Sequence, residues 1–306
     1  MRVLVTGGAG FIGSHLVDAL LAAGEDVTVV DHLRRGHVHN LADALTHGAE
    51  LVRGDVTDVE AMERVLGAVR PDVIFHLGAQ IDVRASVRDP SRDSHVNVGG
   101  TAAMLEAARR TGTPRVVLAS TAGVYGDPAG IPITEEAAIA PLSPYGASKA
   151  AAESYMGLFR RLHGLSTLSL RLSNVYGPRQ DAHGEAGVIA IFCGAAAHGD
   201  TATIYGDGEQ TRDFIYVGDV VEAFRAAGAG SAEGALNVST GIETSLGYLA
   251  RELRLVTTPA PARAGEIKRS CLDPSAIRQA LGWQARVDLD EGLRRTVAAL
   301  PAPAMA

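Results

Sequence analysis

A tyrosine and a lysine four residues apart are suited to proton transfer. Tyr145 and Lys149 occur in the segment SPYGASK, and the Ala- and Leu-rich residues that follow predict a helix running to about His163. Side chains at positions i and i+4 lie one above the other on a helix face. A tyrosine ordinarily titrates near pKa ~10, and a neighbouring ammonium group lowers that value. We therefore expect Tyr145 to remove the proton of a substrate hydroxyl, with the charge of Lys149 favouring the phenolate.

The hydroxyl of Thr121 completes this candidate catalytic set. The apolar run at residues 115–119 predicts a strand that ends in Ser120 and Thr121. In a parallel α/β sheet, ligands bind beyond the carboxyl ends of the strands. Thr121 would therefore lie where the chemistry takes place, and its hydroxyl could hydrogen-bond the same substrate hydroxyl as Tyr145.

A glycine-rich turn near the N-terminus indicates that a dinucleotide takes part in this chemistry. The sequence GGAGFIG lies between the apolar runs 3–5 and 14–21, which predicts a buried strand, a tight turn and an amphipathic helix. Gly7 would allow the sharp turn, Gly10 would let the backbone approach a pyrophosphate, and Gly13 would let the helix pack closely on the sheet. The N–H groups at the start of the helix would then face the phosphates.

An aspartate identifies the expected dinucleotide as NAD. Asp31 ends the apolar run 27–30, about 24 residues after the first glycine of the turn. A carboxylate at this place can bind the adenosine ribose diol and would repel the 2′-phosphate of NADP. The neighbouring Arg34 and Arg35 weaken this argument, so the sequence leaves NADP open as an alternative.

Strands and helices alternate along the first half of the chain. Apolar runs at 73–77 and 115–119 are separated by helical stretches, among them a long one at 93–111. The alternation predicts an α/β fold with a Rossmann-type, doubly wound parallel sheet. We expect a dinucleotide-binding domain at 1–170, with returns from the C-terminal part, and a smaller α/β substrate domain at 171–306 built on it.

The overall composition excludes several other classes of protein. The 306 residues carry a formal net charge of −7, which argues against a nucleic acid or an anionic membrane as the main partner. No apolar run approaches the roughly 20 residues needed to span a bilayer. The first predicted strand starts at residue 2, which leaves no room for a signal peptide, so we expect a cytoplasmic protein.

The cysteines and histidines suggest neither a disulfide framework nor a metal site. The two cysteines, Cys193 and Cys271, occur in unrelated contexts. The ten histidines are scattered, and only His37 and His39 form a close pair, in a polar loop. We therefore expect no bound metal, and we expect His76, inside a predicted strand, to be a core residue.

Six motifs together resemble one known family. They are TGGAGFIGSHL, HLGAQIDV, ASTAGVYGD, SPYGASK, RLSNVYGPRQ and YGDGEQTRDFIYVGDV. They extend over nearly the whole chain and resemble the extended short-chain dehydrogenase/reductases, specifically the nucleotide-sugar enzymes similar to UDP-glucose 4-epimerase. The combination is highly specific for the family and only moderately specific for the substrate.

The resemblance, together with the strand ends, implies a large NAD site. Its expected members are Gly7, Gly10, Phe11, Ile12, Gly13, Asp31, His32, Arg34, Asp55, Val56, Leu77, Ala79, Gln80, Asn97, Ser120, Tyr145 and Lys149. Asp55 and Val56 would lie on the adenine side, and the segment 78–80 on the diphosphate side.

The resemblance also implies a UDP-sugar site in the last third of the chain. Asn174 would touch the sugar diphosphate, and Phe192 and Tyr205 would lie near the uridine. Arg212 and Arg263 match diphosphate-binding arginines, and two guanidinium groups suit a dianionic diphosphate. Further expected substrate-binding residues are Arg84, Ser86, Thr121 and Ser270, with Ser120 and Arg179 as additional candidates for a sugar carboxylate.

The residues after Thr121 discriminate between the reactions of this family. In 4,6-dehydratases the corresponding Thr is typically followed by Asp-Glu, and a decarboxylase branch also carries Glu there; here Ala122 and Gly123 follow. The remaining reaction is inversion at C4 of the sugar through a 4-keto intermediate. We therefore predict an NAD-dependent UDP-sugar 4-epimerase, with UDP-glucose and UDP-galactose as the default pair.

Several alternatives stay open at this point. The small residue Ser270, at a position that gates the sugar, would leave room for UDP-N-acetylglucosamine or UDP-glucuronate. A nucleotide-sugar 4-ketoreductase and a non-catalytic sugar-nucleotide sensor are more distant alternatives. Family members commonly form homodimers through two helices per subunit, here predicted at about 91–111 and 145–163, so we expect a homodimer.

Overall fold

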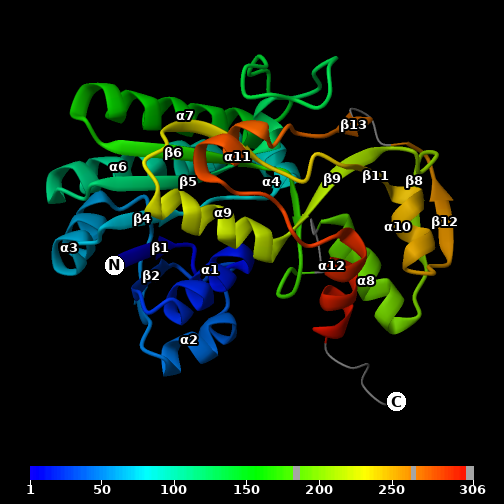
Figure 1. The fold of residues 1–306 in the computed structure, drawn as a ribbon, viewed down its shortest axis with the longest axis horizontal. Coiled ribbons are helices and arrows are strands. Elements are labelled where there is room, and N and C mark those ends of the chain that lie inside the picture. Colours follow the sequence, from blue (N-terminus) through cyan, green and yellow to red (C-terminus); the bar gives the residue numbers. More distant parts are fainter. Residues whose placement is uncertain (182–186, 263–266, 301–306) are drawn as a thin grey trace.

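Seven parallel strands form the central sheet of the protein. The computed structural model describes residues 1–181, 187–262 and 267–300 (Figure 1). The strands of this sheet are β1 (Arg2–Thr6), β2 (Asp26–Asp31), β3 (Glu50–Arg53), β4 (Val73–His76), β5 (Arg115–Thr121), β6 (Ser166–Leu172) and β10 (Gly234–Val238). Their order is β10-β6-β5-β4-β1-β2-β3, and every neighbouring pair is parallel. The order reverses direction at β1 and β4, which confirms the predicted doubly wound sheet.

Helices cover both faces of this sheet. One face carries α1 (Phe11–Ala22), η1 (Val38–Leu41), α2 (Ala42–Thr46), α9 (Val217–Ala229) and α11 (Ser275–Leu281), and the other carries α3 (Val59–Val69), α6 (Gly100–Thr111) and α7 (Pro144–His163). Along β1, Val3 and Val5 pack into the first of these layers and Leu4 into the second. Because successive strand residues point to opposite faces, an uninterrupted apolar strand supplies both cores.

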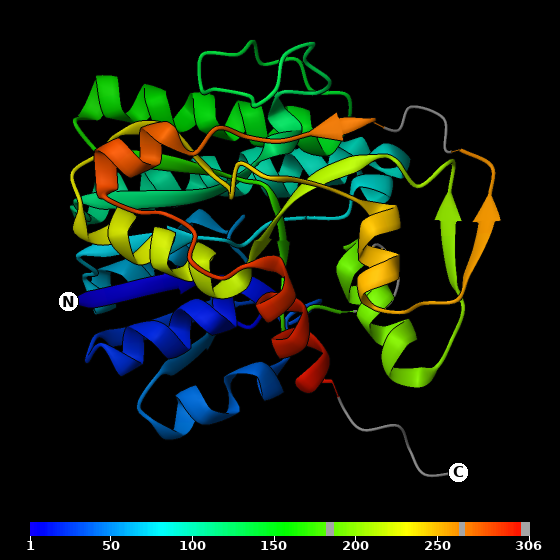
Figure 2. The ribbon, with the colours of Figure 1, turned by 45° about the vertical axis from the view of Figure 1, so that its right-hand side comes forward.

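The C-terminal part adds two smaller sheets at one end of the molecule (Figure 2). In one, β9 (Thr211–Tyr216) pairs with β7 (Asn174–Tyr176), β11 (Glu243–Ser245) and β13 (Arg269–Ser270), and in the other β8 (Ala202–Tyr205) pairs with β12 (Thr257–Ala260). The helices α8 (Val188–His198), α10 (Leu246–Glu252) and α12 (Leu289–Ala298) contribute to the apolar core of this part.

The chain returns from this end to the large sheet through α9, β10 and α11. The predicted division at residue 170 falls inside β6. The boundary therefore cuts a strand of the large sheet and does not lie in a loop between two domains. The assignment of 1–170 and 171–306 as two domains stays a prediction.

The expected helix at 93–111 is interrupted and starts earlier. α5 (Pro90–Ser94) begins at a proline in its first turn and is capped by Asp89, whose Oδ1 accepts from the N–H of Arg92 at 3.0 Å. A π-helical turn, η2 (His95–Gly99), joins α5 to α6. Such turns occur frequently at functional sites, and this one contains Asn97.

No helix within the described ranges is both long and apolar enough to cross a membrane. The two histidines of the polar loop, His37 and His39, stack on each other with ring centroids 5.0 Å apart. No group of three His, Cys, Asp or Glu side chains in the described part of the chain is placed to hold a metal ion.

Candidate active site

The glycine turn between β1 and α1 has the shape that a pyrophosphate requires. Gly7 has a φ of +70°, and a Cβ there would lie 2.7 Å from the main-chain nitrogen of Gly78. A Cβ on Gly13 would collide with the carbonyl oxygen of Gly7. Only glycine fits both places. Gly10 stands before the first residue of α1 and provides no side-chain cap, so the first N–H groups of the helix face outward for an anionic ligand.

Asp31, at the end of β2, holds the glycine turn in place. Its Oδ2 accepts from the N–H of Ala9 at 3.1 Å, and its Oδ1 accepts from the N–H of Leu33 at 2.8 Å. The residue is buried, and His32 lies beside it with Nδ1 at 3.7 Å from Oδ1. A carboxylate has acceptor capacity beyond two hydrogen bonds, so Asp31 can also bind a ribose diol, which stays a prediction.

Arg35, one of the two arginines because of which NADP remained an alternative cofactor, forms an ion pair with an aspartate. Its Nη2 lies 2.9 Å from Oδ2 of Asp82, a buried residue that caps α4 (Val83–Arg88). Because β2 and β4 flank β1 in the sheet, this ion pair joins the loops after β2 and β4 across the glycine turn. The guanidinium of Arg35 is thereby committed to Asp82.

The ends of β3 and β4 form the floor of the expected cofactor site. Burial tends to raise the pKa of Asp55, but two hydrogen bonds from Thr57 and the charges of His32 and Arg34 hold it below its usual value. Val56 is buried, and a Cβ on Gly78 would lie 3.2 Å from its Cγ1. Leu77 and Ala79 are half-buried on either side of Gly78.

Asn97 is bound to the main chain of Gln80. Its Oδ1 accepts from the Gln80 N–H at 2.8 Å, and its Nδ2 donates to the Gln80 carbonyl at 3.0 Å and to Ser148 Oγ at 3.0 Å. Asn97 itself is 2% exposed. The π-helical turn therefore places a carboxamide that fixes the loop after β4 against α7, while direct contact of Asn97 with the cofactor stays a prediction.

The structure brings Thr121, Tyr145 and Lys149 together. Thr121 ends β5, and the other two lie one turn apart near the start of α7, where Ser143 Oγ caps the helix by accepting from the N–H of Gly146. Tyr145 and Thr121 are hydrogen-bonded through their side chains. The ammonium of Lys149 is buried and donates to the carbonyl of Ala119 at 2.9 Å.

The expected low pKa of Tyr145 is not found in the protein alone. Burial raises the pKa of Tyr145 to about 12, with the hydrogen bond from Thr121 lowering it and the charge of Asp93 raising it. Burial also lowers the pKa of Lys149 to about 8. At neutral pH the protein therefore presents a protonated phenol and a largely charged ammonium, because the sequence argument omitted the cost of burying a phenolate.

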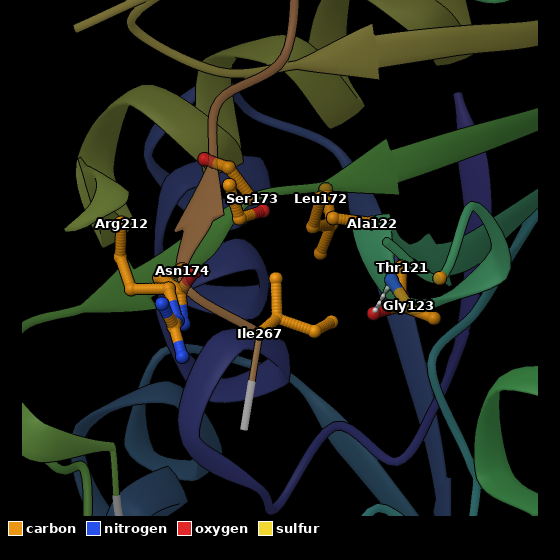
Figure 3. Close-up of a pocket in the computed structure, with 10 residues that line it drawn as sticks. Thr121, Ala122, Gly123, Leu172, Ser173, Asn174, Arg212 and Ile267 are labelled. Carbon is orange, nitrogen blue, oxygen red and sulfur yellow. Dashed lines mark hydrogen bonds between the residues drawn. The ribbon is translucent and has the colours of Figure 1, made fainter. Parts of the chain in front are cut away.

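A cavity of roughly 160 Å³ opens beside Thr121 (Figure 3). Its lining residues are Thr121, Ala122, Gly123, Gly126, Leu172, Ser173, Asn174, Arg212, Ile267 and Ser270. Figure 3 shows Arg212 and Asn174 next to each other at one side and Thr121 at the other. Ser270 is paired with Arg212 through β13 and β9. Four predicted substrate residues thus share one cavity, although their contacts with a substrate stay predictions.

The other predicted substrate residues lie elsewhere. Phe192 is 2% exposed within the core of the small sheets, and Tyr205 is half-buried at the end of β8. Arg84 is exposed on α4. Arg179 is paired with Asp18 at 2.7 Å. Arg263 lies outside the described residues.

Two predicted residues have hydroxyls that are occupied within the protein. Ser86 is fully buried, and its Oγ accepts from the N–H of Tyr145 at 3.1 Å and donates to the carbonyl of Val83. Ser120 is also buried and donates to Oε1 of Glu153. Both hydroxyls are therefore engaged in contacts within the protein, beside the predicted catalytic residues.

Two carboxylates near Lys149, those of the buried Asp93 and the half-buried Glu153, were not predicted from the sequence. Glu153 follows Lys149 by four residues on α7, and Asp93 precedes Asn97 by four residues. Their spacing of four residues from Lys149 and Asn97, which were predicted site residues, could have indicated that they share a helix face with them. It was not decisive, because most charged residues on helices face solvent.

This chain is similar to known nucleotide-sugar enzymes over nearly its whole length. The model of a family described as GDP-mannose 4,6 dehydratase matches residues 4–296. A UDP-glucose 4-epimerase of Mycolicibacterium smegmatis is 46% identical over 97% of this chain and 97% of that protein. The crystal structure of a Thermotoga maritima UDP-glucose 4-epimerase with UDP-glucose is similar with a TM-score of 0.93 at 41% identity, covering 98% of both chains. A Thermus thermophilus UDP-glucose 4-epimerase in complex with NAD gives a TM-score of 0.90 at 44% identity, again over 98% of both chains.

Proposed function

Because this chain belongs to the extended short-chain dehydrogenase/reductase family, among its members similar to UDP-glucose 4-epimerase, we propose that it is an NAD-dependent UDP-sugar 4-epimerase. The default substrate pair is UDP-glucose and UDP-galactose. The support comes from relatives of that activity over nearly the whole chain and from a cofactor turn and catalytic set of the required geometry.

The lining of the cavity is the observation that selects epimerisation. The two residues after Thr121 are Ala122 and Gly123, and none of the ten described residues around the cavity carries a carboxyl group. Elimination of water from a 4-keto sugar needs an acid and a base beside the sugar. Without them, the 4-keto sugar can only be reduced again. The family model is named after a dehydratase, and we therefore take that name to describe a related reaction of other family members.

The catalytic set would act on the C4 hydroxyl of the sugar. The phenolate of Tyr145, which the positive charges of Lys149 and of bound NAD would favour over the phenol present in the protein alone, would take the proton of O4 and return it at the end of the reaction. Thr121 holds the same oxygen by a hydrogen bond, and Lys149 keeps a positive charge beside the phenol. Bound NAD would supply reversible hydride acceptance at C4, and return of the hydride to the opposite face of the sugar would invert C4 with no net oxidation.

The cavity would hold the two parts of the substrate differently. At one side, Arg212 offers a guanidinium and Asn174 a carboxamide, which suit a diphosphate. At the other, the walls are formed by small or apolar residues such as Ala122, Gly123 and Leu172 (Figure 3). Few hydrogen bonds would hold the hexose there, so it could turn over between the two hydride transfers while the UDP remains fixed.

Ser270 favours a second candidate substrate. It is a small residue on the wall of the cavity, beside Arg212. A pocket with this residue leaves room for the N-acetyl group of UDP-N-acetylglucosamine. UDP-glucuronate is less well supported, because Ser86 and Ser120 are occupied within the protein and Arg179 is paired with Asp18.

The test is a direct assay of the three sugars. The purified protein is incubated separately with UDP-glucose, UDP-N-acetylglucosamine and UDP-glucuronate, and the products are resolved by NMR. Interconversion of C4 epimers without added reductant supports the proposal. A reaction that runs only with stoichiometric NADPH would instead identify a ketoreductase.

We also propose that the enzyme is a cytoplasmic homodimer. Tyr155, Leu158 and Leu162 are 39%, 38% and 69% exposed on α7. They lie within one of the two segments expected at the subunit contact, 91–111 and 145–163. Sedimentation of the purified protein would test the dimer.

A further inference from the structure

Only one of the two oxygens of the buried Asp93 carboxylate accepts hydrogen bonds from described residues. Asp93 is 1% exposed, and its Oδ1 accepts from Gln80 Nε2 at 2.7 Å and from Asn97 Nδ2 at 3.3 Å. Its Oδ2 is fully buried and has no hydrogen-bond partner in the described part of the structure. A buried charge without a compensating partner costs several kcal/mol. The hydrogen bonds from the Gln80 and Asn97 amides do not balance this charge, which requires a nearby cation.

Lys149 is a buried cationic group close to this carboxylate in the structure, because Asn97 Nδ2 donates both to Asp93 Oδ1 at 3.3 Å and to Oγ of the adjacent Ser148 at 3.0 Å. Of its three N–H groups, one donates to the carbonyl of Ala119. Asp93 acts on both catalytic side chains, since it raises the pKa of Lys149 and of Tyr145. Asp93 comes from α5 and Lys149 from α7, two helices that pack against each other.

The remaining ionisable groups around Lys149 do not compete for this role. Glu153 also raises the pKa of Lys149, but its carboxylate is bound by Arg171, with Nη2 at 2.7 Å from Oε2 and Nε at 3.1 Å from both oxygens. His76 on β4 is buried between Thr6 and Thr101, and burial lowers its pKa to about 3, so it is neutral. Tyr145 is a neutral phenol in the protein alone. Of the two carboxylates that raise the pKa of Lys149, Asp93 is therefore the one whose charge no described cation already balances.

We infer that Asp93 is the counter-ion of Lys149, a positioning residue that keeps the buried ammonium protonated at neutral pH. The inference rests on the proposed role of Lys149 beside Tyr145. The hydrogen bonds from Gln80 and Asn97 fix the carboxylate, and its second oxygen remains buried without a hydrogen-bond partner among the described residues. Removal of Asp93 would leave Lys149 to lose its proton at a lower pH, and the phenolate of Tyr145 would lose its support.

The composition of the chain permits a direct measurement. Lys149 and Lys268 are the only lysines in the sequence. Protein labelled with ¹³Cε-lysine therefore gives two side-chain NMR signals, and Lys268→Arg assigns them. Lys268 is exposed and serves as an internal control. Lys149 is expected at about 8 in the parent protein.

The decisive variant is Asp93→Asn, which keeps the shape and an acceptor for the two amides. We expect its Lys149 signal to titrate at clearly lower pH than in the parent, so that most of the ammonium is lost at pH 8, while the Lys268 signal is unchanged. The matched control is Asp89→Asn, an exposed cap of the same helix at which Asn serves equally well. It should leave both titrations in place.

A pH profile of turnover separates this role from a merely structural one. In Asp93→Asn the loss of kcat at alkaline pH should begin at a lower pH than in the parent. Loss of the hydrogen bonds from Gln80 and Asn97 alone would instead lower kcat equally at all pH values. If Asp93→Asn does not fold, Asp93→Ser replaces it in both measurements. An unchanged Lys149 titration in a folded variant, or a parent Lys149 that is already neutral at pH 7, overturns the inference. The titration needs no substrate, so its outcome is independent of whether the protein proves to be an epimerase.

Discussion

The main-chain N–H of Tyr145 donates a hydrogen bond to Oγ of Ser86 at 3.1 Å. Ser86 lies on α4, and its hydroxyl proton goes to the carbonyl of Val83 at 2.6 Å. The serine therefore satisfies an N–H in the first turn of α7 that has no partner within the helix. It joins α4 to the residue that we propose as the proton acceptor.

Ser86→Ala should consequently impair the position of Tyr145 and leave substrate binding intact. We expect a lower kcat, a KM for UDP-glucose within about twofold of the parent, and a loss of about 1–2 kcal/mol in the free energy of unfolding, since a buried N–H loses its acceptor. Steady-state kinetics and urea unfolding measure these quantities. A large rise in KM with unchanged kcat would show instead that Ser86 binds the sugar.

The ion pair between Arg35 and Asp82 should slow the release of NAD. It connects the loops after β2 and β4 over the glycine turn, and the arginine is largely exposed. Exposed pairs contribute up to about 1 kcal/mol, so Arg35→Ala should speed NAD dissociation about two- to fivefold. Loss of radiolabelled NAD from the protein after dilution into excess unlabelled NAD measures the rate. Arg34→Ala is the matched control, and an equal effect of both variants would refute a specific role of the pair.

Stability should fall as the solution becomes acidic, because His76 is buried in its neutral form. Burial lowers the pKa of His76 to about 3 in the folded chain, while an unfolded histidine titrates near ~6.5. Below that pH the unfolded state binds a proton that the folded state does not. About 5 kcal/mol of stability is therefore present above pH ~6.5 and lost progressively toward pH ~3.

Urea unfolding between pH 7.5 and 5 tests this dependence. The replacement His76→Gln keeps a polar side chain near Thr6 and Thr101 but cannot take up the proton. Its free energy of unfolding should be lower at pH 7.5 and should depend less on pH. An equal slope in the parent and the variant would assign the acid sensitivity to other groups.

Ser270 should decide whether an N-acetyl group is accepted. It lines the cavity beside Arg212, and a bulky aromatic ring there would fill the space that the substituent needs. We expect Ser270→Tyr to suppress turnover of UDP-N-acetylglucosamine at least about tenfold, while turnover of UDP-glucose is spared. Ser270→Ala, which keeps the space, serves as the control. Equal activity of Ser270→Tyr on both sugars would rule out the gate.

The sequence predicted the large sheet well because its signals are local. The glycines at 7, 10 and 13 stand directly between an apolar strand and a helix, and Asp31 ends the next strand. Tyr145 and Lys149 fall one turn apart on a helix whose length was predicted closely. In each case neighbouring residues determine the geometry, so spacing alone was informative.

The features that the sequence did not predict depend on contacts between distant segments. The pairing of β9 with β7, β11 and β13, which builds the wall of the cavity, joins residues separated by up to about sixty positions. The π-helical turn that places Asn97 against Gln80 has no composition signal of its own. The raised pKa of Tyr145 and the burial of Asp93 arise from packing, which a linear pattern does not contain.

The central claim is that the protein inverts C4 of a UDP-hexose by means of Tyr145. The most direct measurement incubates purified parent protein and Tyr145→Phe with UDP-glucose, without added cofactor, and follows UDP-galactose by NMR. The account predicts an equilibrium mixture of the two sugars with the parent, and with Tyr145→Phe a rate at least about a hundredfold lower with UDP-glucose binding retained. Formation of a dehydrated sugar by the parent, or full activity of Tyr145→Phe, would contradict it.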